Sequence, residues 1–273
     1  MNYANNVRVL SFGAGTQSSA LLALIENGEL PPVDFAVFAD TQCEPDEVYA
    51  WLEKIKTWAK TKIIIATKGN LLMDALECAS GKGKRFSSIP FHTKNIEELY
   101  GNGKGKMKRQ CTFDYKIAVV QKSIRDELGY KPRQHVKHKI EMLIAMSREE
   151  TGRMRDSRIK WIKNVYPLIY EKGWYRQQAI DYMKMQGLGE PPRSSCLMCP
   201  FHGDEEWKRL KENEPHNFEK AVQFDKACRK LPRLNSETYL HKSLKPLDEI
   251  DFTEPQKDII DLFQNECQGM CGV

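Results

Sequence analysis

The sequence contains no run of roughly 18 apolar residues, so we expect no segment that spans a membrane. Its first residues also lack the charged stretch and apolar stretch that mark a secretory signal. No internal repeat or low-complexity tract is present, and a hydrophobic content of 41% excludes disordered and collagen-like chains. The length of 273 residues suits one large domain, or one domain with an appendage.

Eight cysteines are present, although a chain without a secretory signal does not favour a disulfide framework. We therefore expect a cytoplasmic protein in which each cysteine is buried, reactive or bound to a metal. Cys78 and Cys228 fall within helical patterns and Cys43 lies beside a predicted loop, so we assign these three to structure. The remaining five are candidates for chemistry: Cys111, Cys196, Cys199, Cys267 and Cys271.

Positive charge is concentrated in the middle of the chain. The whole sequence has a net charge of +5, yet residues 82–109 hold eight Lys/Arg against two Glu, and residues 131–163 hold ten against four acids. Such a concentration favours an anionic partner, either nucleotide phosphates or a nucleic acid. A solvated lysine-rich surface is the alternative explanation.

Strand-like and helix-like segments alternate over the first 80 residues. Strands are expected at 7–12, 34–40 and 62–66, and helices at 17–27, 45–59 and 70–79. This alternation predicts an α/β fold in which a parallel twisted sheet has helices on both faces. We divide the chain into a nucleotide-binding α/β domain, residues 1–170, and a mainly helical, cysteine-bearing region, residues 171–273.

Residues 80–110 interrupt this alternation, because five glycines lie there among lysines. The composition predicts a mobile loop with a short helix near 95–100. A helix at 113–128 and a strand at 140–146 follow, and a polar, arginine-rich loop begins after Ser147. Further helices are expected at 175–186, 204–212, 217–229 and 255–263.

A loop of small residues, SFGAGTQSS at 11–19, lies between the first strand and the first helix. Small residues permit a tight turn, and the N–H groups of the loop and of the helix N-terminus can bind phosphate. No Gly-Lys-Ser/Thr follows, and the third glycine of the dinucleotide fingerprint is missing, so neither of those motifs applies. A plain strand-to-helix turn is the alternative. The candidate nucleotide-binding residues are Ser11, Gly13, Ala14, Gly15, Thr16, Gln17, Ser18 and Ser19.

Cys196 and Cys199 form a CxxC pair, a spacing that lets two thiolates bind one metal or cluster from a tight turn. A thioredoxin-type redox pair is the alternative, but the preceding PPRSS offers no βαβ context. Cys111 follows Lys108 and Arg109, whose charges lower a thiol pKa and so favour reactivity.

The loop at 13–18 (GAGTQS) resembles the PP-loop of the ATP-pyrophosphatase superfamily (adenine nucleotide alpha hydrolase-like), whose usual form is Ser-Gly-Gly-x-Asp-Ser. The Phe-Gly that begins it is similar to the phosphoadenosine phosphosulfate (PAPS) reductase branch, although Gly13 replaces the usual serine and Gln17 the usual aspartate. Segments 38–42 (FADTQ), 147–155 and 166–174 resemble further family elements in the same order. The resemblance implies binding of an adenosine nucleotide, ATP with Mg²⁺, and adds Asp40 to the nucleotide site.

The same resemblance implies a [4Fe–4S] cluster, because cluster-bearing sulfonucleotide reductases have a Cys-Cys-x-x-Arg-Lys-Val segment before a CxxC. Cys111, Lys116 and Ile117 match that segment, and Cys111 precedes Cys196 by 85 residues. Three cysteine ligands leave one iron open, or a fourth ligand comes from Cys271, Cys267 or His202. Zinc is the alternative metal. The tail that carries Cys267 and Cys271 resembles the Glu-Cys-Gly tail with which PAPS reductases attack their substrate.

Three functional hypotheses follow. The preferred one is a PP-loop enzyme that binds ATP, adenylates an acceptor and helps to replace its oxygen with sulfur, on tRNA or DNA bound by the basic region 82–163. Lys116, Arg153 and Arg155 would neutralise charge on phosphate oxygens. The second is a sulfonucleotide reductase in which Cys267 or Cys271 is the nucleophile, and the third is a non-catalytic, zinc-stabilised nucleic-acid-binding protein. The resemblance also allows a homodimer, and the sulfur donor is not specified.

Overall fold

The structure is a computed structural model that describes residues 6–82, 89–95, 104–232 and 234–253. Its centre is a sheet of five parallel strands in the order β3-β2-β1-β6-β7. These strands are β1 (Asn6–Ser11), β2 (Phe35–Asp40), β3 (Ile63–Thr67), β6 (Lys139–Ile144) and β7 (Ile162–Val165). Among the described residues, no helix has the length and apolar character needed to cross a bilayer.

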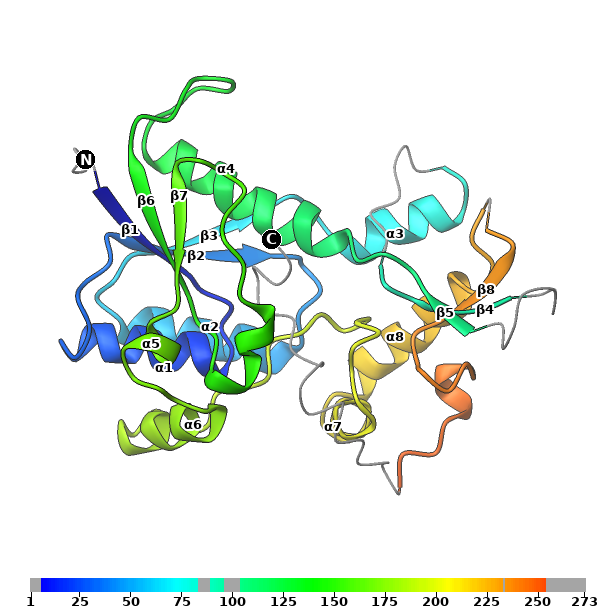
Figure 1. Ribbon diagram of the computed structural model, residues 1–273. Helices are drawn as coiled ribbons and strands as arrows, with labels where there is room; N and C mark the ends of the chain where they lie inside the picture. Colours follow the sequence, from blue (N-terminus) through cyan, green and yellow to red (C-terminus); the bar gives the residue numbers. More distant parts are fainter. Residues whose placement is uncertain (1–5, 83–88, 96–103, 233, 254–273) are drawn as a thin grey trace.

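Both faces of the sheet are covered by helices (Figure 1). Along β1, Val7 and Val9 pack toward α4 (Ala118–Glu127), whereas Leu10 packs with α1 (Thr16–Glu26). The helices α2 (Asp46–Trp58), α5 (Pro167–Tyr170) and α6 (Arg176–Met185) share the face of α1. Strands buried on both faces read as continuous apolar runs, which explains the FAVFA of β2.

A second hydrophobic core lies beside this sheet. It is built from α3 (Leu71–Ala79), α7 (Asp204–Asn213), α8 (Pro215–Ala227) and the 3₁₀ turn Leu247–Glu249. An antiparallel sheet in the order β5-β4-β8 joins them, made of β4 (His92–Asn95), β5 (Lys104–Lys106) and β8 (Ser236–Tyr239). Trp207 of α7 is fully buried in this core.

The structure confirms the predicted α/β fold, and the first three strands and helices lie within two residues of their expected bounds. The prediction of a loop over residues 80–110 is wrong at 92–95 and 104–106, where β4 and β5 form. β4 pairs with β5 and with β8, and β8 follows about 140 residues later, so the composition of the segment gave no sign of a strand. Most of the helix expected near 95–100 and the helix at 255–263 lie outside the described residues.

The two cores draw on segments from both sides of residue 170. The helix α6, which follows that residue, packs against α1 of the parallel sheet through Ala179 and Met183. In contrast, α3 precedes it and contributes Leu71 and Ala75 to the second core. Cys43 and Tyr115 also belong to the second core, so the loops that leave the parallel sheet help to build it.

Candidate functional site

The small-residue loop connects β1 to α1 at the carboxyl edge of the parallel sheet, where ligands of α/β folds bind. Ala14 adopts a left-handed conformation with a φ of 54°, and Gly15 is the residue that precedes the helix. The backbone N–H of Gly15 donates to Ser18 Oγ at 3.2 Å. The N–H groups of the first helical turn lack intrahelical partners, so this turn can bind an anion.

Two side chains of the loop form hydrogen bonds with other parts of the chain. Gln17 Nε2 donates to Ser147 Oγ at 3.3 Å and to Glu150 Oε2 at 3.2 Å, and these two residues follow β6. Ser19 Oγ accepts a hydrogen bond from Trp51 Nε1 at 2.8 Å, inside the core between α1 and α2. These side chains therefore fix the position of the loop, while its backbone is what a nucleotide would contact.

Arginines approach the loop from two directions. Arg176 Nη2 donates to Thr16 Oγ1 at 3.4 Å, and sequence reasoning missed this arginine because it begins a helix rather than lying in a motif. Arg153 pairs with Glu150, the same carboxylate that binds Gln17. Arg155 is exposed, and its Nη1 donates to the carbonyl of Gly152 at 3.0 Å.

Asp40 ends β2, next to β1 at the same edge of the sheet. Its Oδ1 accepts from the backbone N–H of Gln42 at 2.7 Å and from the hydroxyl of Tyr49 at 2.9 Å. Burial, and then the Asp40 carboxylate, raise the pKa of Tyr49, so its hydroxyl stays protonated and donates. Asp40 thus orders the turn after β2, which leads toward the cysteine residues of the site.

The segment before the CxxC pair lies directly against the small-residue loop at 11–19, the candidate nucleotide-binding loop, called the nucleotide loop below. A Cβ atom added at Gly15 would lie 3.0 Å from the Cβ of Ser194 and 3.3 Å from its backbone nitrogen. At Gly13 the nearest atom would be Ser194 Oγ, at 3.7 Å. A glycine is therefore required at position 15, because Ser194 approaches its backbone closely. The sequence could not show this contact, since Ser194 lies far away along the chain.

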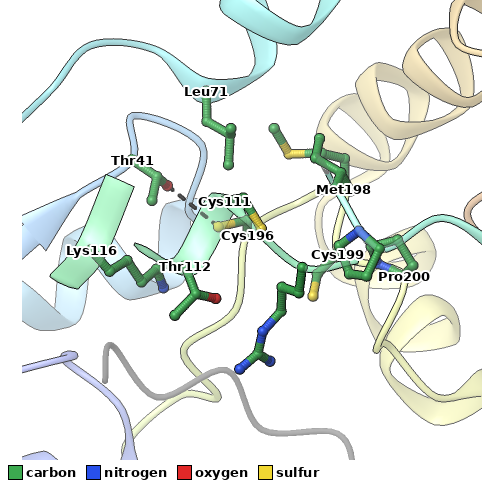
Figure 2. Close-up of a pocket in the computed structure, with 12 residues that line it drawn as sticks. Thr41, Leu71, Cys111, Thr112, Lys116, Cys196, Met198, Cys199 and Pro200 are labelled. Atoms are coloured by element: carbon green, nitrogen blue, oxygen red, sulfur yellow. Dashed lines mark hydrogen bonds between the residues drawn. The ribbon is translucent and has the colours of Figure 1, made fainter. Parts of the chain in front are cut away.

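The CxxC pair continues from this contact into a pocket lined by all three candidate metal-binding cysteines (Figure 2). Cys196 and Cys199 enter it from the CxxC turn, and Cys111 enters from the segment that precedes α4. Thr41, Arg109, Thr112 and Lys116 line the same pocket. Residues separated by 85 positions in the sequence are thus brought together beside the nucleotide loop.

Lys116 reaches the pocket from a π-helical turn, Phe113–Ile117, an irregularity that is frequent at functional sites. The side chains of Lys116 and Glu44 are 6% and 1% exposed, and Lys116 Nζ lies 3.3 Å from Glu44 Oε1. The same carboxylate oxygen accepts from Thr41 Oγ1 at 3.1 Å and lies 3.5 Å from Cys196 Sγ. Sequence reasoning missed Glu44, which lies in an acidic turn typical of a helix start.

A three-thiol donor set with cationic neighbours has the chemistry of an iron–sulfur or zinc site. Among the described residues, however, no three His, Cys, Asp or Glu side chains converge closely enough to hold a metal ion. His202 does not line the pocket: its Nε2 lies 2.8 Å from Ser195 Oγ and its ring packs on Trp207. Burial lowers the pKa of His202 to about 4, so its ring is neutral at pH 7.

The remaining cysteines divide by burial. Cys43 and Cys228 are buried in the second core, and desolvation raises the pKa of each thiol to about 12. Cys43 Sγ also lies 3.4 Å from Asn70 Oδ1. Cys78 is partly exposed on α3. Cys267 and Cys271, candidates for a fourth ligand or a nucleophile, lie outside the described residues.

No protein-family model matches the sequence, and no curated protein matches it. Among solved structures, a crystal structure of phosphoadenylyl-sulfate (PAPS) reductase from Candida auris, a phosphate complex, is similar with a TM-score of 0.42 and 15% sequence identity. The similarity covers 70% of this chain and 76% of that chain.

Proposed function

We propose that this protein is a PP-loop enzyme that binds ATP, adenylates an oxygen of a nucleic-acid acceptor and supports its replacement by sulfur. The observation that carries the proposal is the continuity of the site. Ser194 lies against Gly15 of the nucleotide loop, and Cys196, two residues later, lines the pocket of three cysteines. The backbone that we propose to bind phosphate and the sulfur-bearing side chains are therefore neighbours.

The proposed reaction has two steps. An acceptor oxygen attacks the α-phosphorus of ATP, so that a P–O bond forms to the acceptor and pyrophosphate leaves. A sulfide sulfur then attacks the activated carbon, the C–O bond breaks and AMP leaves with the former acceptor oxygen. The loop at 13–18 and the N–H groups of α1 would bind the phosphates, and Arg176 and Arg153 lie where they can offset negative charge.

The cysteine pocket would serve the sulfur step. Cys111, Cys196 and Cys199 line this pocket and, once their thiols converge further than they do in this structure, would hold a [4Fe–4S] cluster, which when bound supplies an iron that can carry sulfur. Arg109 lines the same pocket, and its positive charge favours thiolate over thiol, whereas the charge of Lys116 is balanced by Glu44. Glu44 fixes Lys116 and the turn at Thr41 in place and balances the charge of this buried lysine.

Anaerobic purification followed by iron and sulfide analysis tests the cluster, which should give a brown protein with broad absorbance. The Cys196→Ser variant should lose the iron, while Cys228→Ser should keep it. Pyrophosphate release from ATP is then measured with and without added tRNA or DNA, and the nucleic acid should stimulate it. A colourless protein that contains zinc and releases no pyrophosphate would overturn the proposal.

The same preparation distinguishes the reductase alternative. A sulfonucleotide reductase would release sulfite from adenylyl sulfate and would need a reactive tail thiol. Loss of sulfite release in a Cys267→Ser/Cys271→Ser double variant, with no pyrophosphate release from ATP, would assign the protein to that activity instead.

A further inference from the structure

Positive side chains also gather at the amino edge of the parallel sheet, opposite the nucleotide loop. The loop between α4 and β6 and the turn before β7 both lie there, because β6 and β7 are parallel neighbours with Ile140 opposite Ile162. Figure 1 shows the α4–β6 loop extending beyond the start of β6. We define the amino-edge basic surface by its exposed cations, Lys131, Arg133, Lys137, Lys139, Arg158, Lys160 and Lys163.

The α4–β6 loop is held in a fixed shape. Arg125 Nη2 donates to the carbonyls of Lys131 and Gln134 at 2.8 and 2.9 Å. Tyr130 accepts from the backbone N–H of Lys137 at 2.9 Å, and Val136 is buried beneath the loop. Its cations are thus presented on an ordered backbone, and less conformational entropy is lost when they bind an anion.

Carboxylates near this surface do not neutralise it. The loop at 130–139 contains no acidic residue, and the turn at 156–163 contains one, Asp156. Glu141 of β6 pairs with Arg8 at 3.2 Å, and Glu127 of α4 pairs with Lys62 at 2.7 Å. Both partners lie outside the amino-edge basic surface, so its own seven cations face solvent with an excess of positive charge.

The basic stretch at 131–163 is therefore divided between two edges of the parallel sheet. Arg148 and Arg153 follow the carboxyl end of β6, near the nucleotide loop, whereas Lys139 begins the same strand. Six residues at about 3.3 Å each separate the two edges by about 20 Å. A single nucleotide bound at the loop cannot reach the amino-edge basic surface, but a duplex of more than about six base pairs spans that distance.

We propose that the amino-edge basic surface binds the phosphate backbone of a double-helical nucleic acid that also reaches the nucleotide edge. This inference rests on the proposed function and specifies its substrate class: a helical region of RNA or DNA rather than a free nucleotide. The surface supplies affinity and orientation, and it makes no contact with the reacting atoms.

The test is fluorescence anisotropy of the full-length protein with a labelled 20-base-pair DNA duplex and a labelled RNA hairpin, over a range of salt concentrations. The variant Lys131→Gln/Lys137→Gln/Lys160→Gln should bind at least about tenfold more weakly at 0.1 M salt. The slope of log affinity against log salt concentration should be smaller in magnitude than that of the wild type by about 2 to 3. The matched control Lys184→Gln/Lys226→Gln/Lys230→Gln removes the same charge elsewhere and should keep the wild-type slope.

Binding of ATP alone separates this inference from the proposed function, because the triple variant should bind ATP as the wild type does. Wild-type affinity and slope for both nucleic acids would overturn the inference even if ATP were cleaved. Weaker nucleic-acid binding in the triple variant, but not in the control variant, would support the inference even if no pyrophosphate were released. Unchanged nucleic-acid binding together with weaker binding of polyglutamate would instead assign the surface to an acidic protein partner. Thermal denaturation of each variant verifies that its fold is retained.

Discussion

At the residue scale, Glu44 holds three groups of the cysteine pocket together: Lys116, Thr41 and Cys196. Removing one member of a buried ion pair leaves the other charge without compensation, which costs more than the pair itself contributes. We predict that Lys116→Met and Glu44→Gln each destabilise the protein by about 3 kcal/mol, because the partner charge then stays buried without compensation.

The double variant Glu44→Gln/Lys116→Met should lose less than the sum of the two single changes, because neither charge is then left alone. Urea denaturation of all four proteins gives the coupling energy. Strictly additive losses would show that the pair is not a unit of stability.

A second prediction at this scale concerns His92 of β4, whose Nε2 lies 3.2 Å from the carbonyl oxygen of Pro200. Desolvation, and then the charge of Lys106, lower the pKa of His92 to about 4 from 6.5. Between pH 6.5 and 4 the unfolded chain therefore binds more protons than the folded protein. Stability should be complete above pH 6.5 and fall as the pH drops through this window, by at most about 1.4 kcal/mol per pH unit.

Urea midpoints measured from pH 4 to 7 test this dependence. His92→Gln keeps an amide donor for Pro200 but cannot titrate, so its stability curve should be flatter than that of the wild type. His135→Gln removes an exposed imidazole and serves as the control. An acid limb of the same steepness in His92→Gln and the wild type would contradict the prediction.

At the element scale, the contact between the nucleotide loop and the segment before the CxxC pair couples the two halves of the site. Gly15→Ala would place a Cβ 3.0 Å from that of Ser194, which must shift. We predict that Gly15→Ala destabilises the protein by about 1 to 3 kcal/mol and weakens ATP binding. Gly13→Ala, whose Cβ would meet only ordinary contacts at 3.7 and 3.8 Å, is the matched control and should change both far less.

The double variant Gly15→Ala/Ser194→Gly removes the Cβ that the first substitution meets. Calorimetric ATP titration and thermal denaturation should show partial recovery of both properties. Equal effects of Gly13→Ala and Gly15→Ala would mean that close packing at Gly15 is not what the loop requires.

The elements differ in how much of them the sequence could predict. Mainly apolar runs such as VRVL and FAVFA predict strands by themselves, because strands buried on both faces of a parallel sheet are rich in consecutive apolar residues. Strand β4 depends on pairing with β8, and β5 depends on pairing with β4; their residues, HTKN and KGK, have no strand pattern of their own. Likewise, Cys111 and Cys196 could be named from motifs, but Glu44 could be found only once folding had buried it.

At the scale of the whole molecule, the fold separates the candidate site from the amino-edge basic surface. The nucleotide loop and the cysteine pocket lie at the carboxyl edge of the sheet, and the amino-edge basic surface lies at the other end of β6 and β7. Nothing in the net charge of +5 indicates this arrangement. A nucleic acid bound along the molecule would bring its helical part to one edge and a reacting nucleotide to the other.

The burial of the cysteines gives a prediction for the whole chain. Cys78, Cys111 and Cys199 are partly exposed, while Cys43 and Cys228 are buried and burial raises the pKa of both thiols to about 12. Brief alkylation at pH 8, read out by mass spectrometry, should therefore modify the first three ahead of the other two, since the thiolate is the nucleophile. Anaerobic loading with iron and sulfide should protect Cys111 and Cys199 and leave Cys78 reactive, because Cys78 does not line the pocket. Equal protection of Cys78, or no protection at Cys111, would show that the pocket does not hold the cluster.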